Sequence, residues 1–387
     1  IIYGKSGTGK SEYCYREIAE NIKKQEKIFI ITPEQFSFTA EKKLMDILKI
    51  SAVLNAEVLT LSRMAYRVIN EIGGRTQTSL TKCGKAMLIY SILSHLKKEL
   101  RFLGKSDENV DIAETAITEF KKHGIKIEQL KNEIEKQEDV YLKNKLKDIC
   151  AIYENFETQI NGKYIDETDL LTILAENIDK TSMFENSIIY IDEFAGFTSQ
   201  EYDIIKKLIK IAKQVTITIC IDELHEIKNP DIDIFYANQK TVKKLLQIAR
   251  ENNVEVEELK LEETYRFKTD ELKYLEENLY QNKYKPYSKQ VENIQLFLAK
   301  NQYSEIEEVA KTILKLVRDE NFRYKDISII TKNIDTYSSL ARAIFDKYEI
   351  PIFIDENHTT LHFEESPPDS PDAPHSRCGL RSGQGQR

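Results

Sequence analysis

The sequence predicts an α/β fold built on a parallel sheet, and three features of the chain support this prediction. The chain opens on GKSGTGKS, Gly4 to Ser11, which is a P-loop of the form G-x-x-x-x-G-K-[ST]. Short apolar runs alternate with stretches of helical periodicity before residue 80 and again after residue 180, as they do in βαβ units. Between these regions helical periodicity dominates. We therefore expect a P-loop parallel sheet with a helical insertion and, towards the end of the chain, the start of a second α/β domain.

The composition suits a globular protein of two or three domains. The 387 residues are 41% hydrophobic and 31% charged, with a formal net charge of −8. This charge argues against wholesale wrapping of nucleic acid but leaves room for a local basic groove. The five cysteines lie far apart, which fits reduced thiols and offers no zinc framework. No apolar run approaches the roughly 18 residues of a membrane span, so we expect a cytoplasmic protein without a membrane partner.

The first α/β region places the P-loop between a strand and a helix. Ile1 to Tyr3 has the character of a strand end, and Ser11 to Ile22 has helical spacing. Lys27 to Thr32 and Ala56 to Leu61 predict two buried strands, and Ser62 to Ile72 predicts a helix after the second. Strand, glycine loop and helix are the context in which loop amides and a helix N-terminus cradle phosphate.

The remaining chain divides into four further parts. Ser187 to Ile191 and Val215 to Ile221 predict strands that return to the first sheet. The charge-rich stretch from Lys121 to Asp139 is interpreted as a solvated helix face, with a binding stripe as the alternative. Strands at Asn293 to Leu298, Ile327 to Thr331 and Ile350 to Ile354, with a helix from Ser304 to Val317, predict the second domain. The predicted divisions are 1–80 and 181–265 for the first α/β domain, 81–180 for the insertion, 266–356 for the second α/β domain and 357–387 for a disordered, proline-rich tail.

An ATP site needs more than a P-loop. Lys10 would reach the β/γ oxygens of the nucleotide and Ser11 would hold Mg²⁺. Asp192 follows four apolar strand residues, where a carboxylate can hold Mg²⁺, and Glu193 beside it can polarise an attacking water. The alternative for both carboxylates is that they cap the next helix. Arg266 follows the last strand of the first sheet and could reach the γ-phosphate.

Six strings in order resemble a known family: GKSGTGKS, TPEQFSFTAEK, LTLSRMAYRV, IDETDLL, IIYIDEFAGFTSQE and TYRF. Their order is similar to the N-terminal half of superfamily 1 DNA helicases, and PEQFSF, IDEF-x-x-FT-x-QE and RYKDISIITKN resemble the AddB family. AddB is the second subunit of bacterial AddAB helicase–nucleases, which process double-strand breaks for recombination. The resemblance implies RecA-like domains that use ATP and Mg²⁺. It assigns the nucleotide site to Gly4, Lys5, Ser6, Gly7, Thr8, Gly9, Lys10 and Ser11, the Walker B position to Asp192 and Glu193, and the fourth helicase motif to Arg266.

The resemblance also implies partners. These are an AddA-like motor subunit in a heterodimer, and single- and double-stranded DNA ends. Ser62, Arg63 and Tyr66 match the DNA-facing helicase motif. The alternative is that Tyr66 belongs to the core and that Arg63 is a surface charge. Gln35 lies in the second helicase string and is given no role in ATP binding.

The sequence departs from the helicase pattern in the motif that couples the γ-phosphate to movement along DNA. Superfamily 1 motors carry G-D-x-x-Q after the strand that follows Walker B, whereas this strand continues Ile221-Asp222-Glu223. The family's nuclease domain and its iron–sulfur cysteines have no counterpart in this sequence. The predicted function is therefore that of the ATP- and DNA-binding, helicase-like part of a helicase–nuclease's second subunit. A catalytically inactive DNA-reading scaffold is the alternative, and a small-molecule kinase fits the long Lys- and Glu-rich insertion poorly.

Overall fold

The computed structural model describes residues 1–48, 55–74, 77–103, 109–166, 168–224, 233–280 and 285–355. The chain divides into two compact units, Ile1–Val291 and Glu292–Arg387. Among the described residues no helix is both long enough and apolar enough to cross a bilayer. The predicted tail, 357–387, lies outside the described residues.

The first unit is built on a six-stranded sheet in the order β3-β2-β6-β7-β1-β8, in which every described pairing is parallel. The strands are β1 (Ile2–Gly4), β2 (Ile28–Ile31), β3 (Ala56–Leu59), β6 (Ile188–Ile191), β7 (Gln214–Cys220) and β8 (Leu259–Lys260). This arrangement confirms the predicted α/β fold with a parallel sheet. Because all strands run the same way, their carboxyl ends meet at one edge, where open α/β sheets bind ligands.

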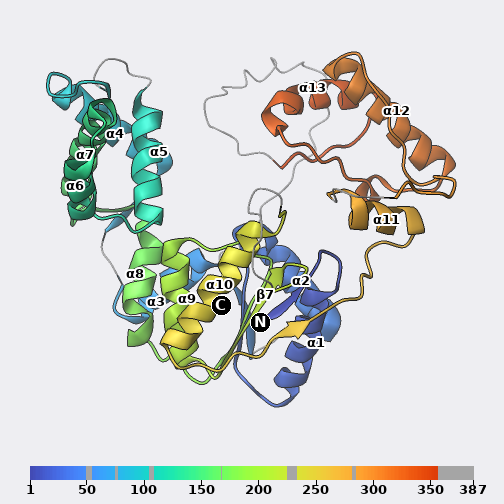
Figure 1. The fold of residues 1–387 in the computed structure, drawn as a ribbon, viewed down its shortest axis with the longest axis horizontal. Helices are drawn as coiled ribbons and strands as arrows, with labels where there is room; N and C mark the ends of the chain where they lie inside the picture. The colour runs from blue at the N-terminus through green and yellow to red at the C-terminus, as the bar shows by residue number, and fades with distance from the viewer. Residues whose placement is uncertain are drawn as a thin grey trace, which may run out of the picture. The chain divides into compact units, whose positions relative to one another are not determined.

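Helices cover both faces of this sheet, so its central strands read as continuous apolar runs (Figure 1). Side chains alternate between the faces: Ile28 and Ile30 pack on one side, Phe29 and Ile31 on the other. The first face is covered by α1 (Lys10–Lys23) and α2 (Ser37–Leu48), which follows the short η1 (Glu34–Phe36). The second face is covered by α3 (Leu61–Glu71), α8 (Asp169–Asn177) with η3 (Ile178–Lys180), α9 (Ser199–Ile211) and α10 (Tyr236–Glu251).

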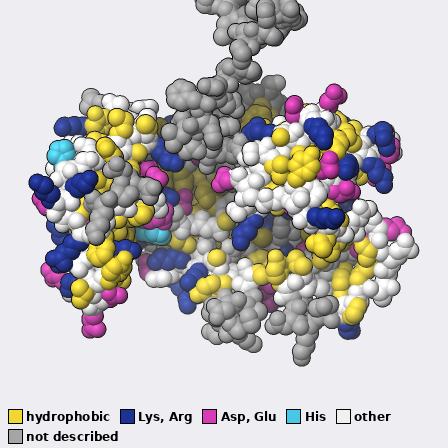
Figure 2. Space-filling view, turned by 90° about the horizontal axis from the view of Figure 1, so that it is seen from above, with side chains coloured by type: hydrophobic (Ala, Val, Ile, Leu, Met, Phe, Trp, Pro, Cys, Tyr) yellow, Lys and Arg dark blue, Asp and Glu magenta, His cyan; other side chains and the backbone are white. Residues whose placement is uncertain are grey.

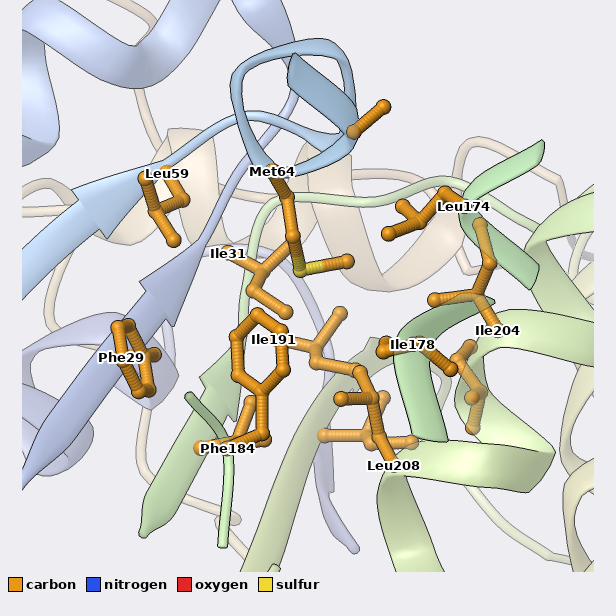
Figure 3. Packing of buried hydrophobic residues seen from close by; sticks show 14 of the residues in the cluster. Phe29, Ile31, Leu59, Met64, Leu174, Ile178, Phe184, Ile191, Ile204 and Leu208 are labelled. Carbon is orange, nitrogen blue, oxygen red and sulfur yellow. The ribbon is translucent and has the colours of Figure 1, made fainter. Parts of the chain in front are cut away.

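The larger core lies on this second face. Met64 of α3 is fully buried there, and the rings of Phe29 and Phe184 lie 5.0 Å apart at 60° (Figure 3). Tilted ring pairs of this kind add to the free energy gained from the buried area. The core therefore fixes the strands whose carboxyl ends carry the site described below.

The helical insertion has a core of its own. It contains α4 (Lys82–Leu96), α5 (Asn109–Lys122), α6 (Ile127–Lys136) and α7 (Val140–Ile160). The chain enters it through β4 (Thr78–Leu80) and leaves it through β5 (Tyr164–Asp166), which pair in parallel. Figure 2 shows hydrophobic, basic and acidic side chains interspersed over these helices, at the left of the view.

The predicted insertion, 81–180, runs through α8. The side chains of α8 pack in the core against the sheet and α3, not in the core of the insertion. The helical spacing of α8 gave no sign of this change, because periodicity shows which face of a helix is buried but not against which core. The predicted domain boundaries remain predictions.

The interpretation of 121–139 as a solvated face was wrong at its first residue. Lys121 is buried, and its Nζ lies 2.7 Å from Glu157, 2.8 Å from Asp169 and 3.3 Å from Asp166. Lys85 Nζ also lies 2.8 Å from Asp166. We call these five residues the junction cluster, because they join α4, α5, α7 and β5 of the insertion to α8 of the sheet domain.

The second unit contains α12 (Gln302–Asp319), η4 (Tyr324–Asp326) and α13 (Ile334–Lys347), which share a small core, whereas α11 (Asp270–Asn278) belongs to the first unit. The three strands predicted here were wrong: the described residues of 292–355 form no strand. A strand needs a neighbour to pair its backbone groups, and these segments have none among the described residues. Several of their apolar side chains, such as Leu296 at 99% and Ile330 at 94%, are exposed, whereas Ile350 packs in the small core.

Candidate functional site at the carboxyl edge of the sheet

The P-loop connects the carboxyl end of β1 to the N-terminus of α1. Gly9 caps this helix in the left-handed conformation, with φ of 80°. Gly7 also has a positive φ, 85°, and a Cβ placed on it would come within 2.6 Å of the Arg266 Cβ atom. Glycine is required at position 7 both by the backbone conformation and by this close approach. The P-loop thus leads directly into the N-terminus of α1, and the N-terminus of a helix attracts anions.

Lys10 is the cation at the centre of the loop. Its ammonium group donates to the carbonyl oxygens of Gly4 at 2.8 Å and Lys5 at 2.7 Å. Burial lowers the pKa of Lys10 below its ordinary value, and the nearby charges of Asp192 and Glu193 partly oppose this effect. The ammonium is therefore held inside the loop, at the place where the motif needs a positive charge.

Asp192 and Glu193 follow β6 at the same edge of the sheet. Asp192 is 4% exposed, and one of its carboxylate oxygens accepts a hydrogen bond from the Thr218 hydroxyl on β7. Glu193 has a positive φ of 66°, which is uncommon for a side chain of its size, and its Oε1 accepts a hydrogen bond from the Ser11 hydroxyl at 3.2 Å. The carboxylate of Glu193 thus lies at the first turn of α1.

The alternative that these two carboxylates cap the next helix is wrong. That helix is α9, and it begins at Ser199. Its N-cap is Thr198, whose hydroxyl accepts from the Glu201 amide, while the Glu201 carboxylate accepts from the Thr198 amide. Asp192 and Glu193 therefore do not cap α9, and their contacts are with Thr218 and Ser11 at the carboxyl edge.

The segment after β8 lies over the P-loop. The Arg266 guanidinium donates to Ser6 Oγ at 2.8 Å, and the Tyr265 amide donates to the Gly7 carbonyl at 2.9 Å. On α11, Glu276 lies 3.3 Å from Lys5 Nζ. The structure thus brings Arg266 to the P-loop, about 260 residues away in sequence.

These residues enclose a cavity of about 580 Å³, which we call the P-loop cavity. Eight of its lining residues were missed in the sequence, among them Thr218, Lys43 and Tyr265. Tyr265 belongs to the TYRF string and could have been found there, whereas Thr218 and Lys43 carry no motif. The lining residues are Ser6, Gly7, Gly9, Lys10, Ser11, Glu12, Tyr15, Lys43, Asp192, Glu193, Phe194, Ala195, Thr218, Cys220, Tyr265 and Arg266.

The donor set of the P-loop cavity fits a magnesium-bound nucleotide. The Ser11 hydroxyl and the Asp192 carboxylate are oxygen ligands of the kind that Mg²⁺ prefers, usually together with substrate phosphates. The glycine loop, the start of α1 and the ammonium of Lys10 suit phosphate oxygens. Across the described ranges no group of three or more His, Cys, Asp or Glu is arranged to hold a metal ion.

The residues predicted to contact DNA lie on α3, outside the lining of the P-loop cavity. Tyr66 is 48% exposed, so the alternative that it belongs to the core is wrong. Arg63 is also exposed and pairs with Glu41 of α2 at 3.0 Å. Ser62 is half-buried, and Gln35 is exposed in η1. Contact with DNA by Ser62, Arg63 and Tyr66 remains a prediction.

The fold and the P-loop cavity define the class: an α/β protein with a P-loop at the carboxyl edge of a parallel sheet. The profile of the family described as ADDB, N-terminal, matches residues 1–276, which is most of the chain. This chain therefore belongs to the AddB family, and the resemblance seen in the sequence is confirmed.

Curated relatives agree with this membership. The chain is 43% identical over 369 residues to the B subunit of the ATP-dependent helicase/deoxyribonuclease of Clostridium tetani (strain Massachusetts / E88), covering 92% of this chain. It is 38% identical to the protein of the same name in Clostridium novyi (strain NT), over 92% of this chain, and 39% identical to that of Clostridium kluyveri (strain NBRC 12016), over 94%. In each case the chain spans about a third, 32%, of the relative's own length.

Proposed function

We propose that this chain is the ATP-binding, helicase-like N-terminal part of the B subunit of a heterodimeric helicase–deoxyribonuclease that resects double-strand DNA breaks for recombinational repair. The observation that carries the proposal is the convergence of Lys10, Ser11, Asp192, Glu193 and Arg266 on one cavity. The names of the relatives, each the B subunit of an ATP-dependent helicase/deoxyribonuclease, support it.

Each of these side chains has a proposed role. Lys10 binds the phosphates, and Ser11 with Asp192 would hold Mg²⁺, which would neutralise phosphate charge. Glu193 accepts a proton from the attacking water, and Arg266, already beside Ser6, stabilises charge on the terminal phosphate. The nuclease activity in the relatives' names is not assigned to any residue of this chain.

The proposal includes two kinds of partner. The relatives are named as one subunit of a larger enzyme, which supports a heterodimer, and we propose an AddA-like motor subunit as the other member. Single-stranded DNA is proposed to contact α3 through Ser62, Arg63 and Tyr66, because an exposed tyrosine beside an arginine can stack on a base and contact a phosphate. Double-stranded ends would be bound by the assembled heterodimer.

Lys10→Ala tests the nucleotide site. We expect it to weaken binding of a fluorescent ATP analogue in Mg²⁺ at least about thirtyfold, because charge-assisted hydrogen bonds contribute roughly 2 kcal/mol. Lys23→Ala, at the exposed far end of α1, is the matched control and should bind like the wild type. Titrations with and without single-stranded DNA would show coupling. Equal affinity in the wild type and Lys10→Ala would overturn the proposed site.

A second candidate is a DNA-reading scaffold in which the nucleotide is structural. It is favoured by one observation: β7 is followed by Ile221, Asp222 and Glu223, without the glycine and glutamine of the G-D-x-x-Q string. If the chain is such a scaffold, or a weak motor, ATP turnover should be slow and DNA should stimulate it little. Brisk, DNA-stimulated turnover by this chain would exclude the scaffold.

A further inference from the structure

A lysine without a motif reaches the P-loop cavity from α2. The Nζ atom of Lys43 lies 4.0 Å from Glu193 Oε1 and 6.0 Å from the centre of the buried Tyr15 ring. Lys43 and its neighbour Lys42 are both exposed, but Lys43 lines the cavity and Lys42 does not. The Tyr15 ring guides the ammonium towards the cavity, since a cation is attracted to the face of an aromatic ring.

Glu193 is held by two groups at one oxygen. Its Oε1 accepts the Ser11 hydroxyl at 3.2 Å and lies beside Lys43 at 4.0 Å. This carboxylate therefore engages the hydroxyl that the motif reserves for Mg²⁺. Before Ser11 can serve a metal and Glu193 can serve a water, the contact between them has to open.

The contact with Lys43 is weak enough to be exchanged. The side chains of Lys43 and Glu193 are 47% and 39% exposed, and their separation is at the long limit of an ion pair. Such pairs stabilise little, because water screens both charges. A terminal phosphate, with more negative charge than a carboxylate and several acceptor oxygens, is a stronger partner for the same ammonium.

We propose that Lys43 is a positioning residue for Glu193 that distinguishes triphosphates from diphosphates. Without a triphosphate, Lys43 keeps Glu193 turned towards Ser11. When ATP enters, the ammonium of Lys43 moves to the terminal phosphate and Glu193 is released. A diphosphate has no group on the Glu193 side of the cavity, so it leaves the pair in place. This proposal rests on the proposed function, since it requires that the P-loop cavity binds ATP.

The experiment compares the affinities of fluorescent ATP and ADP analogues in Mg²⁺ for four chains: wild type, Lys43→Gln, Lys43→Arg and Lys42→Gln. We expect Lys43→Gln to lose about tenfold in affinity for the triphosphate and less than about twofold for the diphosphate. Lys43→Arg should keep most of the preference because it keeps the charge. Lys42→Gln removes the same charge from the next position and should change neither affinity. Melting temperatures without nucleotide check that all four chains fold.

The outcomes separate the two proposals. If the wild type binds both nucleotides and Lys43→Gln weakens both equally, Lys43 acts only through general attraction and this inference is wrong. Unchanged affinities in Lys43→Gln would overturn it as well. In both cases the proposed function stands. If the wild type binds neither nucleotide, the proposed function fails and the role of Lys43 fails with it.

Discussion

Thr218 lies on β7, the strand between β1 and β6, and its side chain lines the P-loop cavity. In the sheet Thr218 lies opposite Ile2 of β1, and Ile217 lies opposite Ile191 of β6. The Thr218 hydroxyl donates to Asp192, and both side chains are 4% exposed. This hydrogen bond orients the Asp192 carboxylate at the carboxyl edge of the sheet.

Thr218→Val and Thr218→Ser form a matched pair at this position. Thr218→Val keeps the shape but removes the donor, so we expect the free energy of unfolding to fall by about 1–3 kcal/mol. We also expect a higher Mg²⁺ concentration for half-maximal binding of the ATP analogue. Thr218→Ser keeps the donor and should stay near the wild type in its Mg²⁺ requirement. Chemical denaturation and a Mg²⁺ titration measure the two effects, and identical Mg²⁺ curves for both variants would contradict this role.

The sequence revealed those parts of the site that lie in short, continuous motifs. The P-loop, the carboxylates after β6 and Arg266 each stand in a short motif. Thr218 and Lys43 do not, because their contacts with Asp192 and Glu193 depend on strand order and on the path of α2. A sequence alone does not show that β7 lies between β1 and β6, so it could not indicate which β7 hydroxyl meets Asp192.

At the scale of elements, the junction cluster holds the insertion to the sheet domain. Burial would lower the pKa of Lys121, but Asp169, Glu157 and Asp166 together raise it above its ordinary value of 10.5. Burial likewise opposes ionisation of Asp166, yet Lys121 and the hydrogen bond from Lys85 hold its pKa below 3.8. A buried lysine facing three carboxylates is costly to remove, because the carboxylates would lose their counter-charge.

Lys121→Met should therefore lower the free energy of unfolding by about 3–5 kcal/mol. The adjacent Lys122 on the same helix makes only an exposed pair with Glu119 at 3.1 Å, so Lys122→Met should cost less than about 1 kcal/mol. The contribution of Lys121 is lost only as the pH rises above 10.5, and that of Asp166 only as it falls below 3.8. Burial raises the pKa values of Glu157 and Asp169 above their ordinary range, so these carboxylates also titrate above pH 4. The difference between Lys121→Met and wild type should therefore be flat only above that titration, from about pH 7 to about pH 9, by denaturant unfolding. Equal losses in both variants, or a strong slope in this window, would contradict the cluster.

The elements themselves were predicted where their signals are local. Apolar runs marked β2, β3, β6 and β7, and the spacing of residues 11–22 marked α1. The predicted strands of the second unit failed because pairing depends on a neighbour elsewhere in the chain. The prediction that Lys121 is exposed failed for the same kind of reason. The charge pattern around it is that of a surface helix, while its partners come from α7, β5 and α8.

At the scale of the whole molecule, every residue of the P-loop cavity belongs to the first unit. We therefore expect a chain ending at Val291 to bind the ATP analogue within about threefold of the full chain, since compact units of this kind fold around their own cores. Binding titrations and melting curves of both chains measure this. A folded shorter chain that has lost affinity would show that the second unit contributes to binding.

The strand order has a consequence for how the protein is made. β1 leaves the ribosome before the other strands of its sheet, but both of its neighbours, β7 and β8, begin only at residues 214 and 259. At roughly 5–20 residues per second, β1 waits on the order of ten seconds or more for a partner. The P-loop therefore takes its final shape only after the insertion has been synthesised. Nucleotide captured by a nascent chain would then report that the sheet has closed.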